Sequence, residues 1–585
     1  MLNEEIAKTF ENMARVLAFK DQDRFRIMAY ERAAVSLRDL DVDLATIARS
    51  GKLQEIPGIG KDLAGMIEEY IESRKIKKYE QACRGISGGL IELMSIPGLG
   101  PKTLALFHKK LRVNDFDTLK RALESGKAAK LRGFGAKKVE NLQRGIDLWL
   151  LGRKRMLLGV ALPMAENLLE QLRKIKLVER ADMAGSLRRE RETVGDMDVL
   201  IASSDGERAL GQCVKLPVVK QVLASGGTRA TVIIEGGIQV DIRAVPKECY
   251  GAALQYFTGS KQHNVHLRSI AHERGLRLNE YGVFRGEKNL GGKDESEVYS
   301  LLDMPVMPPE LREDRGEIEA AMQGRLPKLV ELKDLRGDLH AHTDYSDGQA
   351  TVEEMVRHAA ELGYDYIALT DHSPAARIAN GLDVNRVEEK LREVERLRTK
   401  LGPAKPRILF GTEVDILPDG KLDYPDEVLA KFDVVVASIH SAFRAGRDEL
   451  TRRLIAAVAN PHVHILGHPT GRLIGTRDPL EFDFERVMKM AIEHNVALEV
   501  NGSMYRLDLN DVMAKAAQEA GALLAIGSDA HSTAQMDQIR YGVFQARRGW
   551  VEARSVVNTW AWPKLERWLQ ARKPNRNNLT RRRSA

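Results

Sequence analysis

The C-terminal part of the sequence repeats one pattern, a short apolar run followed by a histidine or an acidic residue. Ten of the fourteen histidines lie after residue 335. A lone histidine in such a place is more often a core or surface residue, but the recurrence after six consecutive apolar segments predicts one shared site. The residues are His340, His342, Asp347, His372, Glu413, His440, His468, Asp529 and His531.

These nine residues are more than one tetrahedral ion needs, so we predict two or three ions with Glu413 placed to bridge them. Ligation by His, Asp and Glu without Cys suits Zn²⁺, Mn²⁺ or Fe²⁺. A site with several such ions activates water near neutral pH and polarises a phosphoryl oxygen. The chemistry predicted for this part is therefore phosphoester hydrolysis.

A second candidate site consists of three aspartates in the middle of the chain. Asp196 and Asp198 lie in DMDVLIA (196–202), where a two-residue period puts them on one face of a strand. Asp241 lies in ATVIIEGGIQVDIRAV (230–245), which predicts a hairpin through its Glu-Gly-Gly turn. If the strands pair, the three carboxylates converge and repel unless cations neutralise them. The alternative is three unrelated aspartates at strand ends.

All-oxygen ligands with room for substrate phosphates suit Mg²⁺ or Mn²⁺. Two such ions can clamp the attacking and leaving oxygens of an in-line phosphoryl transfer. Just before the aspartates, the polar turn at Gly185, Ser186, Arg188 and Arg189 could offer N–H, hydroxyl and guanidinium groups to a triphosphate.

The N-terminal part contains a third kind of candidate site, a repeated Gly-x-Gly turn. The copies are LQEIPGIGKDLAGMI (53–67), LMSIPGLGPKTLALF (93–107) and the weaker AKLRGFGAKKVENL (129–142). Each predicts a turn whose N–H groups point outward at a helix N-terminus, which binds phosphate without selecting a base. One copy alone would indicate an ordinary helix–helix turn, but three favour backbone binding. The residues are Gly58, Gly60, Lys61, Gly98, Gly100, Lys102, Gly133 and Gly135.

The elements that carry these residues differ along the chain. After residue 338 short apolar runs alternate with helical patterns such as TVEEMVRHAAELG, which predicts a parallel α/β fold, barrel-like, with its ligands at the carboxyl ends of the strands. The repeats before residue 150 predict helices. A charged stretch with four prolines before residue 337 predicts an interdomain connection with some helix, and we place a boundary near residue 335.

Composition narrows the protein class. The 585 residues allow about three to five domains. Three widely spaced cysteines, Cys83, Cys213 and Cys249, argue against a disulfide framework or a thiolate zinc site. No apolar run approaches membrane-spanning length, and the N-terminus lacks a signal pattern, so we expect a cytoplasmic protein. A net charge of +7 is compatible with a polyanionic partner, and the basic tail (571–585) is either a phosphate contact or a solvated end.

Two motif sets resemble known families. GSLRRERETVGDMDVLI (185–201) looks like the nucleotidyltransferase signature of X-family DNA polymerases, the family of DNA polymerase beta, and residues 240–284 are similar to its third aspartate, nucleotide pocket and thumb. The three repeats resemble helix-hairpin-helix motifs. DLHAHTDYSDG, TDHS, GTEVDI, SIH, GHPT and SDAH match the PHP (polymerase and histidinol phosphatase) domain over residues 337–570. The joined architecture resembles the bacterial and archaeal PolX enzymes.

The polymerase resemblance implies roles for particular residues. Asp196, Asp198 and Asp241 would hold two ions, with Asp241 helping to activate the primer 3′-hydroxyl. The expected nucleotide contacts are Ser186 and Arg189 at the triphosphate with Gly185 in the same turn, Tyr256, Phe257 and Gly259 at the sugar, and Asn264 and Arg268 near base and template. Two residues depart from the pattern of the beta enzyme. Lys261 replaces an acidic residue beside the base, and Met66 replaces the lyase lysine, so lyase chemistry would need Lys61 or another amine.

The PHP resemblance implies a distorted (β/α)7 barrel with three ions. The implied ligand sets are His340, His342, Glu413 and Asp529; Glu413, His440 and His468; and Asp347, His372 and His531, all of which are present. Arg377, Arg444 and Arg472 are either phosphate contacts or exposed barrel-loop arginines.

Seven regions follow from both resemblances. They are an N-terminal helical DNA-end-binding region (1–80), fingers (81–150), an α+β nucleotidyltransferase palm (151–247), a thumb (248–315), a linker (316–336), the PHP region (337–570) and the basic tail (571–585).

We expect a DNA-directed DNA polymerase that fills short gaps in repair and a metal-dependent 3′–5′ exonuclease in the PHP region. Cleavage at abasic sites is a plausible extension. The expected partners are gapped or nicked DNA and deoxynucleoside triphosphates, for a nucleoid-associated monomer. The alternatives are a nuclease or abasic-site endonuclease with a weak polymerase, and a nonenzymatic DNA-end-binding scaffold. Extension of a gapped primer that is lost without Asp196 and Asp198 but kept without His342 separates them.

Overall fold

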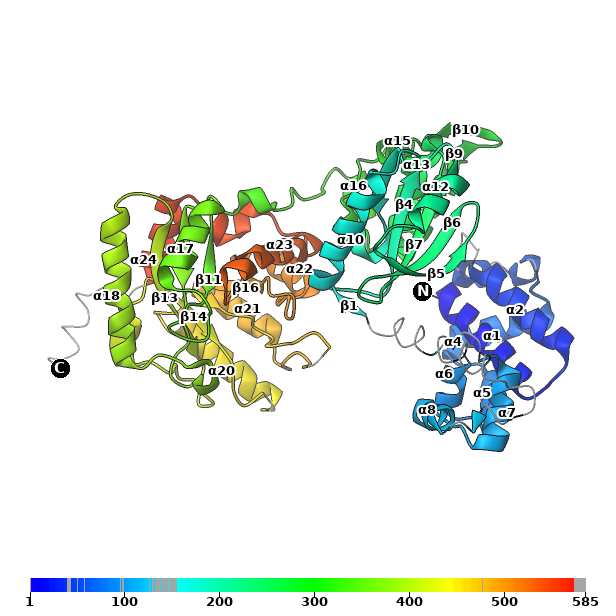
Figure 1. Ribbon diagram of the computed structural model, residues 1–585, viewed down its shortest axis with the longest axis horizontal. Coiled ribbons are helices and arrows are strands. Elements are labelled where there is room, and N and C mark those ends of the chain that lie inside the picture. Colours follow the sequence, from blue (N-terminus) through cyan, green and yellow to red (C-terminus); the bar gives the residue numbers. More distant parts are fainter. Residues whose placement is uncertain are drawn as a thin grey trace. The chain divides into compact units, whose positions relative to one another are not determined.

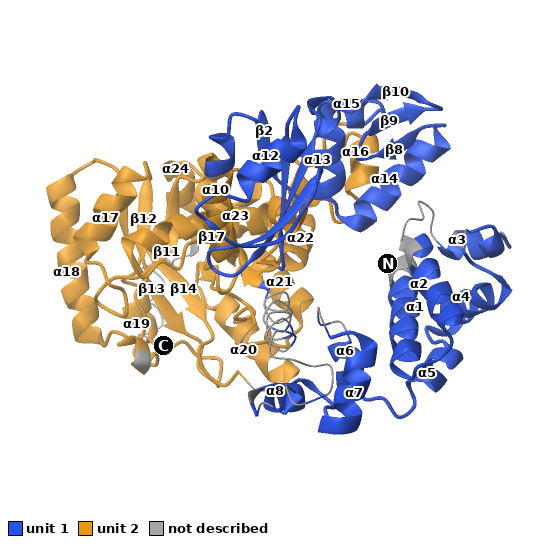
Figure 2. Cartoon of the chain, turned by 45° about the vertical axis from the view of Figure 1, so that its right-hand side comes forward, with its two compact units in different colours: residues 1–155, 171–184, 195–304 blue, residues 156–170, 185–194, 305–585 orange. Residues whose placement is uncertain are grey.

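The computed structural model describes residues 2–38, 44–49, 51–56, 58–94, 96, 99–125, 127–128, 131, 138, 142, 146, 155–443, 445–475 and 477–572. The chain forms two compact units (Figure 2). The first comprises residues 1–155, 171–184 and 195–304, and the second comprises residues 156–170, 185–194 and 305–585. Within the described ranges, no helix combines the length and apolarity that crossing a bilayer would require.

The N-terminal part of the first unit is helical, as the sequence predicts. Its first core contains Ile6, Phe10 and Leu37, and its second contains Leu93, Leu104 and Phe107. The helices that surround these cores are α1 (Leu2–Phe19), α2 (Arg24–Arg38), α3 (Leu44–Arg49), α4 (Lys61–Ser73), α5 (Lys77–Cys83), α6 (Gly88–Leu93), α7 (Pro101–Leu111) and α8 (Phe116–Glu124) (Figure 1).

The rest of the first unit is built on a five-stranded sheet in the order β2-β4-β7-β6-β5. The strands are β2 (Arg180–Met183), β4 (Met197–Ala202), β5 (Val219–Ser225), β6 (Arg229–Ile234) and β7 (Gln239–Val245). Strands β6 and β7 form the predicted antiparallel hairpin. Strand β4 lies parallel to β7 with Asp198 directly opposite Asp241. Helix α12 (Gly206–Cys213) follows β4.

Three further helices and a small sheet complete this part of the unit. Helices α13 (Tyr250–Thr258) and α14 (Lys261–Glu273) precede the antiparallel sheet of β8 (Arg277–Asn279), β9 (Gly282–Arg285) and β10 (Lys288–Gly291), and α15 (Glu295–Ser300) follows. Tyr250 is fully buried, and its hydroxyl donates to Asp182 on β2, so α13 is anchored to the large sheet.

The second unit contains seven parallel strands in the order of the sequence. They are β11 (Gly337–Ala341), β12 (Tyr366–Leu369), β13 (Arg407–Asp415), β14 (Val434–Ser438), β15 (Ile465–Leu466), β16 (Ala497–Asn501) and β17 (Leu524–Gly527). The N–H of His342 donates to Ala530 and the N–H of Asp529 donates to His340, which joins the first strand to the end of the last. The predicted barrel is therefore confirmed, in a nearly closed form.

Helices follow and cover these strands (Figure 1). They include α17 (Val352–Glu361), α18 (Val384–Leu401), α20 (Arg447–Ala459), α21 (Phe484–Glu493), α22 (Asp511–Glu519), α23 (Ile539–Arg548) and α24 (Trp562–Arg572). The strands are buried along almost their whole length, as expected of parallel strands covered by helices. Helix α17 starts where the Thr351 hydroxyl and the Glu354 carboxylate exchange capping bonds with each other's N–H.

Short segments from the middle of the chain also belong to the second unit. They are β1 (Met156–Leu157), which pairs with β3 (Thr193–Val194), most of α10 (Leu158–Arg173), and α11 (Gly185–Arg188). Helix α16 (Glu317–Met322) lies in the stretch predicted to connect the domains with some helix.

Candidate functional site

All nine histidine and acid candidates lie at the carboxyl ends of the barrel strands or in the loops that follow them. His340 is the penultimate residue of β11 and His342 follows that strand, while Glu413 lies near the end of β13. His372, His440 and His468 come two or three residues after β12, β14 and β15. Asp529 and His531 follow β17, and Asp347 lies in the loop after β11. Parallel strands end at the same rim, so residues up to 191 positions apart in sequence come together there.

Glu413 is the centre of the arrangement. Its Oε1 lies 2.9 Å from Nε2 of His468 and 3.3 Å from Nε2 of His440. Its Oε2 lies 3.0 Å from Nδ1 of His372, 3.6 Å from Nε2 of His340 and 3.7 Å from Nε2 of His342. The carboxylate thus faces five histidine rings and is in the place expected of a bridging ligand.

Two further carboxylates complete the cluster. Asp529 Oδ1 lies 3.3 Å from Nε2 of His342, and Asp347 Oδ1 lies 3.3 Å from Nε2 of His531 and 3.6 Å from Nε2 of His372. Three groups have ligand atoms within 4.8 Å of one another: His342, Asp347, His372 and His531; His340, His342 and Asp529; and His372, Glu413 and His440. These groups overlap with the sets implied by the resemblance but divide the histidines differently.

The donor atoms fit a set of cations. Buried atoms without a hydrogen-bond partner include Nε2 of His340, both ring nitrogens of His342, Nδ1 of His372, Nδ1 of His468 and both carboxylate oxygens of Glu413. Buried polar atoms are normally paired, because leaving one unpaired costs about 1–3 kcal/mol. Lone pairs of imidazole and carboxylate that converge in this way suit Zn²⁺, Mn²⁺ or Fe²⁺.

The electrostatics of the cluster agree with this fit. Burial, and then the nearby rings of His531 and His372, lower the pKa of His342 to about 4. Burial also acts to lower the pKa of His440, but Glu413 and Asp415 outweigh it and raise that pKa to about 10. Without cations the carboxylates therefore hold protons on some of the rings. Cation binding would release those protons.

Several supporting residues were not predicted from the sequence. Oε1 of Glu499 on β16 lies 2.6 Å from His340 Nδ1, and Oε2 of Glu499 accepts the N–H of His468. Asp415 contacts Nδ1 of His440 at 3.1 Å. Such outer carboxylates orient ligand rings and fix their tautomers. The sequence could have indicated Glu499, because Glu499 and Asn501 are polar residues on the same face of an otherwise apolar strand.

The three predicted barrel-rim arginines differ from one another in the structure. Arg472 is buried, and its guanidinium donates to the carbonyl oxygens of Arg506 and Leu507 and to Glu192. Arg377 is exposed, and Arg444 lies outside the described residues. Arg506 was not predicted from the sequence, yet its Nε lies 3.4 Å from Asp529 Oδ2.

The three aspartates lie together in the first unit. Asp196 directly precedes β4, so the strand begins one residue later than predicted, and Asp198 faces Asp241 across the β4–β7 pair. Asp241 accepts from Arg229 at 2.7 Å and from the Thr231 hydroxyl at 2.5 Å. Burial, then the charges of Asp196 and Asp241, raise the pKa of Asp198 to about 6. The three aspartate carboxylates are spaced more widely than the barrel ligands. Among the described residues, every ligand group whose atoms lie within 4.8 Å of one another is in the barrel.

The other predicted nucleotide contacts fall into two sets. In the first unit, Tyr256 and Phe257 end α13 with their rings 5.1 Å apart, and Asn264 donates to the carbonyl of Tyr256 and accepts from Gln255. Gly259 is the C-cap residue of α13 with φ 70°, and Arg268 lies on α14. In the second unit, Gly185 and Ser186 begin α11, and Arg189 follows it with its Nε 3.1 Å from Glu313.

The predicted backbone-binding turns are partly described. Gly60 and Gly100 are the N-cap residues of α4 and α7, and a Cβ at either position would meet no atom within 4 Å. Gly58 has φ 82°, a conformation that favours glycine. Lys61 is exposed, and Lys102 pairs with Asp21 on the surface. Gly98, Gly133 and Gly135 lie outside the described residues.

Comparison with known proteins decides the family. A DNA polymerase/3′-5′ exonuclease PolX of Bacillus subtilis is 38% identical over 574 residues, which cover 97% of this chain and 100% of the relative. The chain belongs to the PolX family. The predicted family and enzyme class, a DNA polymerase joined to a PHP exonuclease, are therefore confirmed.

Family models match separate parts of this PolX-family chain. They are a helix-hairpin-helix domain (1–76), a SAM-like helix-hairpin-helix tandem (90–147), the DNA polymerase beta thumb (253–313) and the PHP domain (338–503). The helix-hairpin-helix and PHP predictions are thereby confirmed.

The barrel of the PolX-family chain also resembles shorter proteins. A probable phosphatase of Thermoanaerobacter sp. is 31% identical over 238 residues, covering 38% of this chain and 89% of the relative. A probable phosphatase of Escherichia coli O127:H6 is 29% identical over 214 residues, covering 34% of this chain and 80% of the relative.

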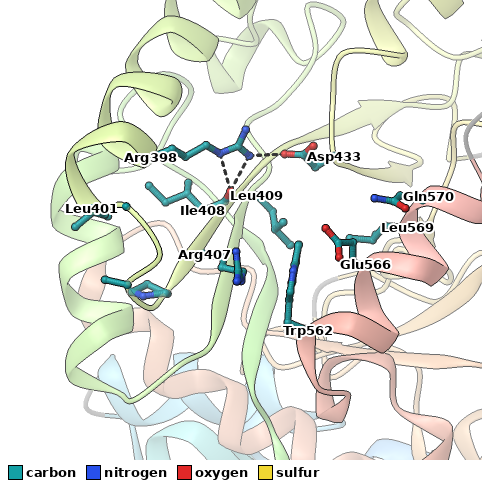
Figure 3. Close-up of a pocket in the computed structure, with 13 residues that line it drawn as sticks. Arg398, Leu401, Arg407, Ile408, Leu409, Asp433, Trp562, Glu566, Leu569 and Gln570 are labelled. Atoms are coloured by element: carbon teal, nitrogen blue, oxygen red, sulfur yellow. Dashed lines mark hydrogen bonds and ion pairs between the residues drawn. The ribbon is translucent and has the colours of Figure 1, made fainter.

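A cavity of about 360 Å³ lies at the other end of the PolX-family barrel (Figure 3). It is lined by Arg407 and Leu409 at the amino end of β13, by the C-terminal part of α18, and by Trp562 of α24. Glu413 lies six residues along β13 from Arg407, which is about 20 Å at a rise of about 3.3 Å per residue. This cavity contains none of the predicted site residues.

Proposed function

We propose that this chain fills short gaps in DNA with the aspartate-bearing sheet and removes 3′-terminal nucleotides with the barrel. The observation that carries the proposal is that one PolX-family chain holds two separate sets of ligand residues, an all-oxygen set on β4 and β7 and a histidine-rich set on the barrel rim. The two sets suit different cations and different phosphoryl chemistry.

For extension, Asp196, Asp198 and Asp241 would hold Mg²⁺ or Mn²⁺. Such ions lower the barrier to phosphoryl transfer by stabilising charge on the attacking and leaving oxygens. Arg229 and Thr231 hold the Asp241 carboxylate in place, and Asp241 would accept the proton of the primer 3′-hydroxyl. Holding the reacting groups in place before the reaction lowers the barrier, because the entropy of bringing them together is then lost on binding and not in the transition state.

The incoming deoxynucleoside triphosphate would be held by the residues that the polymerase resemblance implies. Ser186 and Arg189, with Gly185, would meet the triphosphate. The edge-to-face pair Tyr256 and Phe257 would exclude a 2′-hydroxyl, with Gly259 leaving room beside the sugar. Asn264 and Arg268 would contact the base and template. The bonds from Gln255 to Asn264 and from Asn264 to the carbonyl of Tyr256 support this assignment, because they tie the base contact to the sugar contact.

For shortening, the nine rim residues would hold two or three Zn²⁺, Mn²⁺ or Fe²⁺ ions. Ions of this kind supply an activated water and polarise the phosphoryl oxygen of a phosphodiester. Neighbouring carboxylates would orient the ligand rings: Glu499 contacts the ring of His340, and Asp415 contacts the ring of His440.

The helix-hairpin-helix turns would hold the DNA backbone. Open N–H groups at the start of α4 and α7, with Lys61 and Lys102 beside them, suit phosphates without base preference. Gly58, Gly98, Gly133 and Gly135 would shape these turns. The proposed setting is repair of gapped or nicked DNA near the nucleoid, by a monomer.

The test uses a 5′-labelled primer in a gapped duplex, with and without deoxynucleoside triphosphates. Wild type should lengthen the primer when nucleotides are present and shorten it when they are absent. Asp196→Ala/Asp198→Ala should lose only lengthening, and His342→Ala should lose only shortening. If neither variant changes any product while DNA binding persists, both catalytic proposals are wrong.

A further inference from the structure

One guanidinium at the barrel rim is unexplained by the ligand set. Arg506 lies in the loop between β16 and α22, at the carboxyl end of the strand where the histidines also gather. Its side chain is 17% exposed, and its Nε lies 3.4 Å from Asp529 Oδ2. The other oxygen of Asp529, Oδ1, faces His342 at 3.3 Å and His340 at 3.7 Å. Arg506 and the histidines therefore approach the same carboxylate from different oxygens.

The contact with Asp529 uses only the Nε donor of Arg506. Its Nη1 is buried and has no hydrogen-bond partner. A guanidinium carries five N–H donors in a rigid planar fork, and a buried donor without a partner is costly. That fork matches two oxygens of a phosphate. An anionic group that arrives from outside the chain would satisfy the remaining donors.

The surrounding chain holds Arg506 in this position. Arg472 donates through Nε to the carbonyl of Arg506 at 2.8 Å and through Nη2 to the carbonyl of Leu507 at 2.6 Å. Asp508 is fully buried, where it accepts the N–H of Thr470 at 3.0 Å, and its carbonyl accepts the N–H of Asn501 at 2.6 Å. The loop is thus fixed at Arg506 and at the two residues that follow it, as preorganised binding requires.

We propose that Arg506 binds a nonbridging oxygen of the phosphate group on which the barrel acts, directly beside Asp529. The inference rests on the proposed hydrolysis and names the group that holds its substrate and its nucleoside monophosphate product. Arg472, for which the sequence left open a phosphate contact or an exposed loop position, is instead the residue that positions the Arg506 loop.

The experiment uses the full chain as Arg506→Ala and Arg506→Lys, with Arg407→Gln at the other end of the barrel as the control (Figure 3). Four quantities are measured: metal content by mass spectrometry, KM and kcat for primer shortening, calorimetric affinity for thymidine monophosphate, and primer extension. Arg506→Ala should keep its metal content and its extension, and should bind thymidine monophosphate about 10- to 100-fold more weakly. KM should rise more than kcat falls. Arg506→Lys should be intermediate, Arg407→Gln unchanged, and millimolar guanidine should partly restore Arg506→Ala.

A structural role gives a different pattern. If Arg506→Ala loses metal along with activity and guanidine restores neither, Arg506 only holds Asp529 and the proposal is wrong. Unchanged affinity for thymidine monophosphate would also overturn it. If wild type shortens no primer but still binds thymidine monophosphate through Arg506, the proposed hydrolysis fails while the phosphate site stands.

Discussion

At the scale of single residues, the barrel site depends on close approach as much as on ligand identity. Glu499 reaches His340 Nδ1 at 2.6 Å, and Gly527 on the neighbouring strand leaves the space for this contact. A Cβ at Gly527 would lie 2.5 Å from Glu499 Oε1 and 2.8 Å from Cβ of His340. Neither neighbour is free to move, because both lie inside the packed rim.

Gly527→Ala should therefore displace Glu499 and His340 and damage only the barrel activity. A misplacement of about 1 Å can cost roughly 100-fold in rate. We expect primer shortening to fall by about that factor and metal content to drop, with primer extension unchanged. Gly446→Ala is the matched control, because a Cβ there meets no atom within 4 Å. Full shortening activity in Gly527→Ala would show that this approach is unimportant.

A second residue, Glu190, makes stability depend on pH. Burial, then the nearby carboxylate of Glu310, raises the pKa of Glu190 well above its usual 4.5. One oxygen of Glu190 is buried without a hydrogen-bond partner. The folded chain therefore holds this proton to higher pH than the unfolded chain does. The ionisation of Glu190 therefore lowers the free energy of unfolding progressively as pH rises from about 4.5 toward the folded-state pKa.

Glu190→Gln should raise Tm at pH 8, because the amide has no charge to bury. The gain should be smaller at pH 5 and vanish below about pH 4, where Glu190 is protonated in both the folded and the unfolded chain. Scanning calorimetry at both pH values measures it. Glu481→Gln, on an exposed loop, should change Tm at neither pH. A gain of equal size at pH 5 and pH 8 would contradict this titration.

At the scale of elements, helix α18 is tied to the strand ends that carry the site. Lys390 on α18 pairs with Asp371 at 2.6 Å, and both side chains are 1% exposed. Its Nζ also donates to the carbonyls of Leu369 and Gly411. Asp371 in turn accepts from Thr343 and Ser346, in the loop that leads to Asp347. One buried pair thus connects a helix, two strands and a ligand loop.

Lys390→Met should destabilise the barrel by about 3–5 kcal/mol, because it leaves the Asp371 charge buried and unpaired. Hydrogen exchange in peptides that contain β12 and β13 measures the loss locally. Lys489→Met removes the exposed pair with Glu485 and should have no measurable effect. Lys390→Met/Asp371→Asn should recover part of the loss. If the single variant exchanges like wild type, the pair does not hold these elements.

At the scale of the whole molecule, two ligand sets of different chemistry reside in one chain. Carboxylates on β4 and β7 present only oxygen, whereas the barrel presents six histidines and three acids. Oxygen ligands suit Mg²⁺, and imidazole suits Zn²⁺, Mn²⁺ or Fe²⁺. The two activities should therefore differ in the ions that support them.

Removal of all metal with a chelator should abolish both lengthening and shortening of a labelled primer. Mg²⁺ added back should restore lengthening and leave shortening at least about tenfold below its original rate, because imidazole sites bind Mg²⁺ poorly. Mn²⁺ should restore both. His342→Ala should show the same Mg²⁺ requirement for lengthening as wild type. Equal recovery of both activities with Mg²⁺ alone would contradict the division of ions.

The barrel, the hairpin and the residue types of both sites are predictable from the amino-acid sequence. Each depends on local information: apolar runs of strand length, a Glu-Gly-Gly turn, and ligand-type residues placed after the runs. Parallel strands bring their carboxyl ends to one rim, so the strand pattern is enough to predict that His340 and Asp529 lie together. The family resemblance added the expected roles.

Which side chains contact which depends on tertiary packing. The Asp198–Asp241 register depends on how β4 packs beside β7. Arg189 donates to Glu313, which is 124 residues away, and Arg472 donates to the backbone carbonyls of Arg506 and Leu507. Arg506 approaches Asp529 only because the loop after β16 folds back over the rim. Loop paths and long-range partners arise from packing of the whole unit, and no local pattern in the chain encodes them.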